Sequence, residues 1–93
     1  MTDKQFEYKC SDYHGVPITD NYTLWIYKKS VVIADDRTED SGVRFASIAE
    51  ALEVVIDDGR KVKDIIETWT DMPEQPLDAD IIWHTKKEGK INA

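Results

Sequence analysis

Two runs rich in β-branched and aromatic residues, Tyr22–Tyr27 and Val31–Ala34, constrain the fold of this 93-residue chain more than any other feature. They flank the short polar segment Lys28–Ser30, an arrangement typical of a β-hairpin. Neither run alternates cleanly between polar and apolar residues, as a strand with one solvated face would. Both faces of this hairpin are therefore expected to need cover.

The second face of the hairpin has two alternative explanations. In the first, Trp25 and Tyr27, or else Leu24 and Ile26, form an exposed apolar patch that binds a partner or a second copy of the chain. The protein would then be a self-associating structural or assembly protein, and its acidity would serve only solubility. In the second, the segment Ser11–Asn21 or the C-terminal segment folds over that face. The sequence leaves both open.

Two amphipathic helices are predicted after the hairpin. The first begins at Ser47, which stands at capping-box spacing from Glu50, and extends to Asp58, with Gly59 ending it. Its expected apolar face consists of Ile48, Leu52, Val55 and Ile56. The second helix covers Lys61–Thr70, where apolar residues recur at the i, i+3, i+4, i+7 spacing of one helix face, namely Val62, Ile65, Ile66 and Trp69.

The other segments carry weaker signals. Gln5–Cys10 alternates, with Phe6, Tyr8 and Cys10 on one side, and is predicted to be a strand. Turn formers predict loops at Ser11–Asn21 and Asp35–Arg44, and two prolines predict an extended connector over Asp71–Asp78. A last strand is predicted at Ile81–His84. Residues 11–21 and 71–80 leave room for an additional short strand, and residues 86–93 are expected to be a frayed tail.

These elements predict a single α+β domain over residues 1–93. The expected architecture is a largely antiparallel sheet of about four strands with two amphipathic helices packed on one face, in the order β-β-β-α-α-β. The length is sufficient for a core that needs neither disulfides nor metal.

Acidic residues are segregated along the chain. Fourteen of the nineteen fall between Asp35 and Asp80, where five basic residues oppose them, so this window carries −9 of a total net charge of −7. Carboxylates three or four residues apart on a helix lie roughly 6 Å apart, which resembles the spacing of phosphates along a nucleic-acid strand. The predicted first helix contains no basic residue. Its carboxylates, with their neighbours, are therefore the candidate docking surface: Asp35, Asp36, Glu39, Asp40, Glu50, Glu53, Asp57, Asp58, Asp64 and Glu67, continued by Asp71 and Glu74.

This surface suggests a small non-enzymatic binding protein, with a basic protein surface, such as that of a nucleic-acid-binding enzyme, as its partner. The alternative is that these carboxylates are only the solvated faces of amphipathic helices. A sequence pI of 4.7 argues against direct nucleic-acid binding. No membrane partner is expected, because no apolar run approaches the length that spans a bilayer.

No catalytic residue, cofactor or metal is predicted. Cys10, His14 and Asp12 supply only half of a metal site, and the sequence cannot place His84 beside them. An enzyme or metal site around these residues remains a minor alternative, since a thiol and an imidazole are the groups that nucleophilic catalysis requires. The single cysteine and the absence of a signal-peptide pattern favour a cytoplasmic location.

The chain resembles a group of known proteins in its size, its charge and a set of short segments that span roughly a quarter of its length. The segments that carry the resemblance are Phe45–Leu52, Asp57–Gly59 and Val62–Ile66. They resemble small acidic proteins of bacterial phages and mobile elements, some of which are anti-CRISPR or anti-restriction inhibitors. The resemblance implies a protein that blocks a host nuclease by occupying its basic nucleic-acid channel, but it transfers no functional residue.

Overall fold

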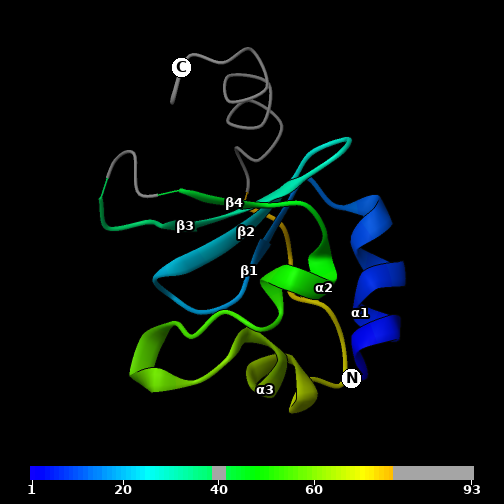
Figure 1. The fold of residues 1–93 in the computed structure, drawn as a ribbon. Helices are drawn as coiled ribbons and strands as arrows, with labels where there is room; N and C mark the ends of the chain where they lie inside the picture. The colour runs from blue at the N-terminus through cyan, green and yellow to red at the C-terminus, as the bar shows by residue number, and fades with distance from the viewer. Residues whose placement is uncertain (39–41, 77–93) are drawn as a thin grey trace.

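A four-stranded antiparallel sheet forms the centre of the computed structural model, which describes residues 1–38 and 42–76. Its strands are β1 (Gly15–Pro17), β2 (Tyr22–Ile26), β3 (Val31–Asp35) and β4 (Val43–Phe45), and they lie side by side in sequence order (Figure 1). The predicted α+β class and the antiparallel sheet are therefore confirmed.

The central hairpin of β2 and β3 forms as predicted. Leu24 pairs with Ile33 and Trp25 pairs with Val32, while the Tyr27 N–H donates to the Ser30 carbonyl at 2.9 Å and closes the turn. Because successive side chains of a strand point to opposite faces, Leu24 and Trp25 belong to different faces of the sheet. Both are buried, which explains why neither strand alternates in sequence.

The two outer strands are three residues long and lie in segments predicted to be loops. β1 falls within Ser11–Asn21, where the sequence left room for a short strand, and its Val16 pairs with Leu24. β4 overlaps the predicted loop Asp35–Arg44, so the prediction is wrong at its end. Strands this short contain too little periodicity to be recognised, and they form because the central hairpin supplies backbone hydrogen-bond partners.

The N-terminal strand prediction is wrong, because α1 (Asp3–Lys9) is a helix. Its signal is a capping box: the Thr2 side chain accepts from the Gln5 N–H, and the Gln5 side chain accepts from the Thr2 N–H. Phe6 and Cys10 are four residues apart and fully buried, whereas Tyr8 is 81% exposed. The alternation of apolar residues was therefore misleading: Phe6 and Cys10 lie on the buried face of a helix, and Tyr8 lies on its exposed face.

The predicted helix from Ser47 to Asp58 is much shorter in the structure. Ser47 is the N-cap and accepts from the Glu50 N–H, but α2 extends only over Ile48–Ala51. Beyond it, Val55 forms an isolated bridge with Lys61, and a 3₁₀ turn, η2 (Asp57–Gly59), follows. The β-branched run that starts at Val54 disfavours a helix and finds extended partners instead, so Val55 is 58% exposed rather than on a buried face.

The second predicted helix is confirmed as α3 (Val62–Glu67). Val62, Ile65 and Ile66 are buried, as the spacing indicated, and Trp69 packs against the same core just beyond the helix end. Lys61 is the N-cap residue but makes no side-chain capping bond. The buried apolar face therefore holds this short helix in place.

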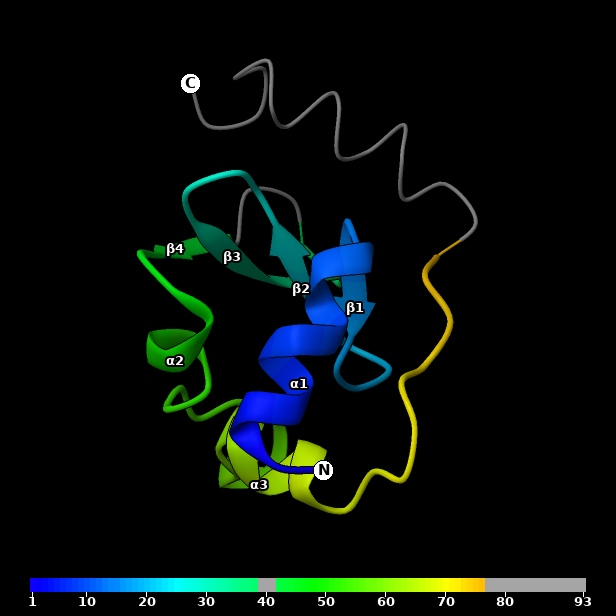
Figure 2. The same ribbon diagram turned by 90° about the vertical axis from the view of Figure 1, so that its right-hand side faces the viewer.

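The helices α1, α2 and α3 lie on one side of the sheet (Figure 2). The main core lies between these two layers and combines Phe6 and Cys10 with Leu24, Leu52 and Ile66, all at most 1% exposed. A smaller cluster of Trp25, Val32 and Ala34 occupies the other face of the sheet, with Tyr27 packed against it.

The element order differs from the predicted β-β-β-α-α-β, since the described part begins with a helix and contains a fourth strand before α2. The predicted last strand Ile81–His84 and the predicted tail, residues 86–93, lie outside the described residues. Within the described ranges, no helix is long and apolar enough to cross a membrane.

Candidate functional site

The carboxylates predicted to form one docking surface divide into two groups in the structure, and the first group is neutralised internally. Glu53 makes ion pairs with Lys61 at 3.0 Å and with Lys63 at 2.9 Å, and hydrogen bonds from Lys63 and Lys61 lower the pKa of its carboxyl group. This pairing follows from the early end of α2, which brings Glu53 beside the segment that leads into α3. Glu53 is therefore a poor candidate for a partner contact.

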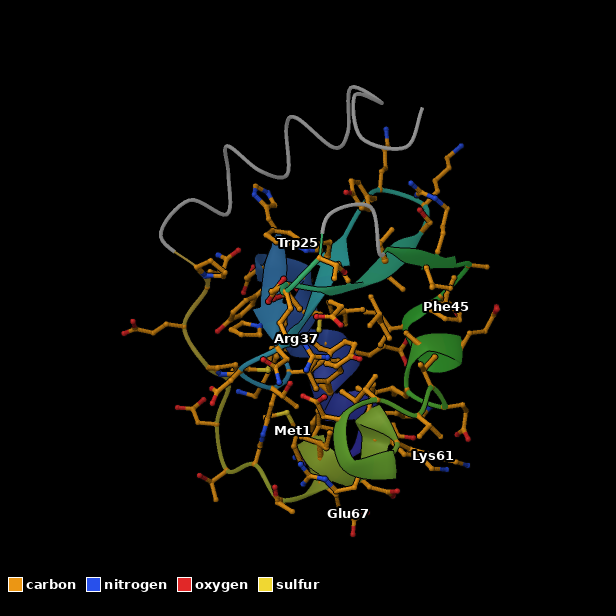
Figure 3. All side chains as sticks on the ribbon, turned by 90° about the vertical axis from the view of Figure 1, so that its left-hand side faces the viewer. Met1, Trp25, Arg37, Phe45, Lys61 and Glu67 are labelled. Carbon is orange, nitrogen blue, oxygen red and sulfur yellow. The ribbon has the colours of Figure 1, made fainter. Side chains whose placement is uncertain are left out.

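Asp35 and Asp57 also belong to the internally paired group. Arg37 donates to Asp35 from its side chain, at 2.9 and 2.8 Å, and from its backbone N–H, and these bonds lower the pKa of Asp35 to about 2. Asp57 accepts from the Thr19 hydroxyl at 3.2 Å and from the Asn21 amide at 3.0 Å. Figure 3 shows Arg37, whose Nη2 also lies 3.8 Å from Asp57. These two carboxylates thus join three loops of the fold.

The second group of carboxylates is exposed. Glu50 lies on α2, and Asp64 and Glu67 lie on one face of α3; none of the three makes an ion pair within residues 1–38 and 42–76. Asp36 is exposed and accepts from the Thr23 hydroxyl at 2.6 Å. Glu39 and Asp40 lie outside the described residues, and the side chain of Asp58 is not described. The helical stripe predicted from Glu50 to Asp58 does not form, because the helix ends before Glu53.

The predicted apolar interface is largely enclosed. Trp25 is only 4% exposed, and Tyr27 is half-buried with the Arg44 guanidinium carbon 5.2 Å from the centre of its ring. The alternative pair gives no exposed patch either, because Leu24 is fully buried in the main core and Ile26 is half-buried. An interface through Trp25 would require this side chain to leave its buried position.

Cys10 and His14 do not form a reactive pair. Cys10 is fully buried, and burial, with a smaller contribution from Glu7, raises the pKa of its thiol to about 12. A protonated thiol is neither a good nucleophile nor a metal ligand. Among the described residues no group of three or more metal-ligating side chains comes together, and His84 lies outside them.

Cys10 should therefore resist thiol reagents in the folded protein. We expect labelling by a soluble disulfide reagent to be slow in native buffer and complete in denaturant, because the thiolate forms only when the chain opens. The control is Ser11→Cys, which places a second thiol at the exposed neighbouring position and should react at once. Fast labelling of Cys10 in the native wild type would contradict its burial.

The same thiol gives an expected pH dependence of stability. The unfolded thiol ionises near pH 9.0, but the folded one keeps its proton to about pH 12. The free energy of unfolding should therefore fall by roughly 1 kcal/mol per pH unit as the pH rises between these values. Denaturant titrations from pH 8 upward measure this slope, and Cys10→Ala should lack that component. Equal slopes in the two proteins would show that the Cys10 thiol ionises normally.

The sequence did not indicate an open cleft of about 550 Å³ that lies between the segments Pro17–Asp20 and Thr68–Pro73. Two carboxylates, Asp20 and Asp71, line it, and among the residues that the structure describes no lysine, arginine or histidine does. Figure 2 shows the chain after α3 passing alongside β1 and the loop that follows β1. About fifty residues of sequence separate the two walls, so no local pattern could show that they meet. The sequence indicated only that part of one wall, the connector Asp71–Asp78, is extended.

Both walls of the cleft are held by hydrogen bonds. Thr19 Oγ1 accepts from the N–H groups of Asn21 and Tyr22, which fixes the turn between β1 and β2. On the other wall, the Tyr13 hydroxyl donates to the Pro73 carbonyl at 2.8 Å. Gln75 Oε1 accepts from the N–H groups of His14 and Gly15 and holds the same segment against the edge of the sheet. The cleft is therefore preformed.

No family model matches this chain, and neither does any curated protein or solved structure. The features that the described residues offer to a ligand or partner are the exposed carboxylates and the cleft. The cleft lies between the loop after β1 and the segment after α3, and the exposed carboxylates lie on α2, on α3 and in the segments that follow β3 and α3.

Proposed function

We propose that this protein is a non-enzymatic binding protein that docks exposed carboxylates on a basic surface of a partner protein. The observation that supports the proposal most is the run of exposed acids Asp64, Glu67, Asp71 and Glu74, none of which makes an ion pair within residues 1–38 and 42–76. Glu67 lies on the side of the molecule far from the sheet (Figure 3). A partner can therefore bind these carboxylates without breaking an ion pair within the described residues.

The electrostatics of this region fit such a role. Asp64 and Glu67 are three residues apart on α3 and share a helix face, so their fields add. Carboxylates on one surface steer a basic partner during diffusion and weaken wrong encounters, an effect that salt screens. Binding by this surface should therefore weaken strongly as ionic strength rises.

The non-enzymatic part of the proposal has its own support. Strongly perturbed titratable groups mark many catalytic sites, but structural ion pairs perturb pKa values too. In this structure the lowered pKa values of Asp35 and Glu53 come from ion-pair partners that also join loops of the fold. The raised pKa of the Cys10 thiol comes from burial away from solvent.

The inhibitor type of small acidic phage or mobile-element protein is one form of this proposal, in which the docked surface is the basic nucleic-acid channel of a nuclease in the cytoplasm. Mimicry of a nucleic-acid strand would depend on the carboxylates of α3 and the segment after it. It cannot depend on a continuous helix from Glu50 to Asp58, since α2 ends at Ala51.

The test is capture of a partner from a bacterial lysate at low and high salt, with the captured protein identified by mass spectrometry and then purified. We expect a basic protein whose complex dissociates at high salt and is displaced by duplex DNA or RNA. The triple variant Asp64→Asn/Glu67→Gln/Glu74→Gln should weaken the purified complex about tenfold or more.

The matched control is Asp3→Asn/Glu7→Gln/Asp12→Asn, which removes the same number of charges from α1 and the turn after it. It should change affinity by no more than about threefold, through the loss of long-range attraction alone. Capture of no basic protein, or equal losses in the two triple variants, would overturn the proposal.

A further inference from the structure

The cleft between Pro17–Asp20 and Thr68–Pro73 combines an apolar lining with negative charge. Pro17, Ile18, Trp69, Met72 and Pro73 contribute apolar surface, and Asp20 and Asp71 are exposed carboxylates on opposite walls. Its volume of about 550 Å³ is in the usual range for a small-ligand or side-chain pocket. An occupant must therefore offer both flat apolar surface and positive charge.

Trp69 is held firmly in this lining. Its ring is 6.0 Å from the ring of the buried Phe6, with an angle of 60° between the planes, and its backbone N–H donates to the Ile66 carbonyl. Trp69 is half-buried and lines the cleft. A tryptophan fixed in this way attracts cations through its ring at little entropic cost.

The surroundings of the cleft add negative charge. The Tyr13 hydroxyl, bonded to the Pro73 carbonyl, has a pKa raised first by burial and then by Asp71, Cys10, Glu74 and Asp12. One positive charge contacts the same wall: the Met1 amino group donates to the carbonyls of Glu67 and Trp69. These bonds to neutral carbonyls leave the charge of the ammonium group in place, but the two carboxylates of the described lining, Asp20 and Asp71, outnumber it.

We infer that this cleft receives an arginine side chain from an extended basic segment of the partner protein. A guanidinium group is planar, stacks on tryptophan and proline surfaces, and donates to carboxylates from both edges. Asp20 and Asp71 supply acceptors from the two walls, and Trp69 supplies the aromatic surface. The inference rests on the proposed function and adds the residue type that is recognised.

The experiment uses a blocked Gly-Gly-Arg-Gly-Gly peptide and its citrulline counterpart, which has the same shape but no charge. Titration into the isotope-labelled protein is followed by NMR, at concentrations up to the millimolar range expected for one side chain in an open cleft. We expect the arginine peptide to shift the Trp69 indole N–H and the amides of residues 18–20 and 68–72. The citrulline peptide should leave these signals in place.

The variant Asp20→Asn/Asp71→Asn tests the carboxylates, and both positions are exposed, so folding should be retained. We expect at least tenfold weaker binding of the arginine peptide, whereas the control Asp3→Asn/Glu7→Gln should bind as the wild type does. Equal binding of the citrulline peptide, equal affinity in the two variants, or shifts spread over the whole acidic surface would each overturn the inference.

The test of the arginine cleft and the test of the proposed function can give different results. A partner complex that is weakened by Asp64→Asn/Glu67→Gln/Glu74→Gln but not by Asp20→Asn/Asp71→Asn would leave acidic docking in place and remove the arginine cleft. A cleft that binds the arginine peptide, in a chain that captures no basic protein, would retain the cleft and remove the proposed docking.

Discussion

Replacing Phe6 with alanine is expected to destabilise the fold by about 3–5 kcal/mol, the largest loss that we predict for a single substitution in this chain. Phe6 is fully buried, packs against Trp69 and joins α1 to the main core. Its removal leaves a cavity between the helices and the sheet, and a small domain has only about 5–15 kcal/mol in total. Urea unfolding followed by circular dichroism measures the change in free energy.

Tyr8→Ala is the matched control for Phe6→Ala. Both residues are aromatic and lie on α1, but Tyr8 is 81% exposed, so its loss should cost no more than about 0.5 kcal/mol. If the segment were a strand with Phe6 and Tyr8 on one buried side, the two substitutions would have similar costs. Similar costs would therefore contradict the helix and its orientation.

The second large effect is expected at Gly15, where alanine should cost about 1–3 kcal/mol. A Cβ atom at this position would lie 2.7 Å from Cζ3 and 2.9 Å from Cε3 of Trp25, the residue paired with Gly15 across β1 and β2. Trp25 is 4% exposed, so its side chain cannot move aside into solvent without losing its packing. Thermal and urea unfolding of Gly15→Ala would measure the loss.

A double substitution shows whether the ring is the cause. Trp25→Leu removes the atoms that the new methyl group would meet, so Gly15→Ala should cost less in that background than in the wild type. Gly59→Ala is a contrast of another kind: Gly59 has a φ of +71° and no atom near a new Cβ, so its cost of roughly 1 kcal/mol comes from the backbone alone. An undiminished cost of Gly15→Ala in the Trp25→Leu background would show that crowding by the ring is not responsible.

Local signals were sufficient for the central hairpin and α3. The run Tyr22–Tyr27 and the i, i+3, i+4 spacing of Val62, Ile65 and Ile66 predicted elements that the structure contains within a few residues. The hairpin was predicted from its β-branched and aromatic composition on either side of a short polar turn, and α3 was predicted from its helical periodicity. Ser47 likewise marked a helix start correctly, since capping depends only on neighbouring residues.

The same reasoning gave wrong predictions for two short segments. Six residues from Gln5 to Cys10 fit a period of two as well as a helix with Phe6 and Cys10 buried, and the capping pair Thr2 and Gln5 was the only local clue that distinguished them. After Ala51, the tendency of Val54 and Val55 toward extended structure outweighed the helical pattern. Propensity and periodicity conflicted at both places, and tertiary contacts decided the outcome.

The sequence correctly located the excess of acidic residues but could not show which of them form ion pairs inside the fold. Asp35 and Glu53 are as acidic in the sequence as Glu67, yet the fold brings Arg37 to Asp35, and Lys61 and Lys63 to Glu53. Pairing of this kind depends on which loops meet, as with Asp57 and the Thr19–Asn21 turn. A charge count alone therefore overestimates the surface available to a partner.

The sequence by itself determined the class of the protein, its central hairpin, the α3 face and the sign of its surface, because these depend on composition and on neighbours along the chain. Only the tertiary structure decided the identity of α1, the end of α2, the short outer strands and the cleft beside Trp69. Each of these depends on contacts between residues far apart in sequence, such as Gly15 with Trp25 or Tyr13 with Pro73. Such contacts form only when the whole core has closed, and no local pattern specifies them.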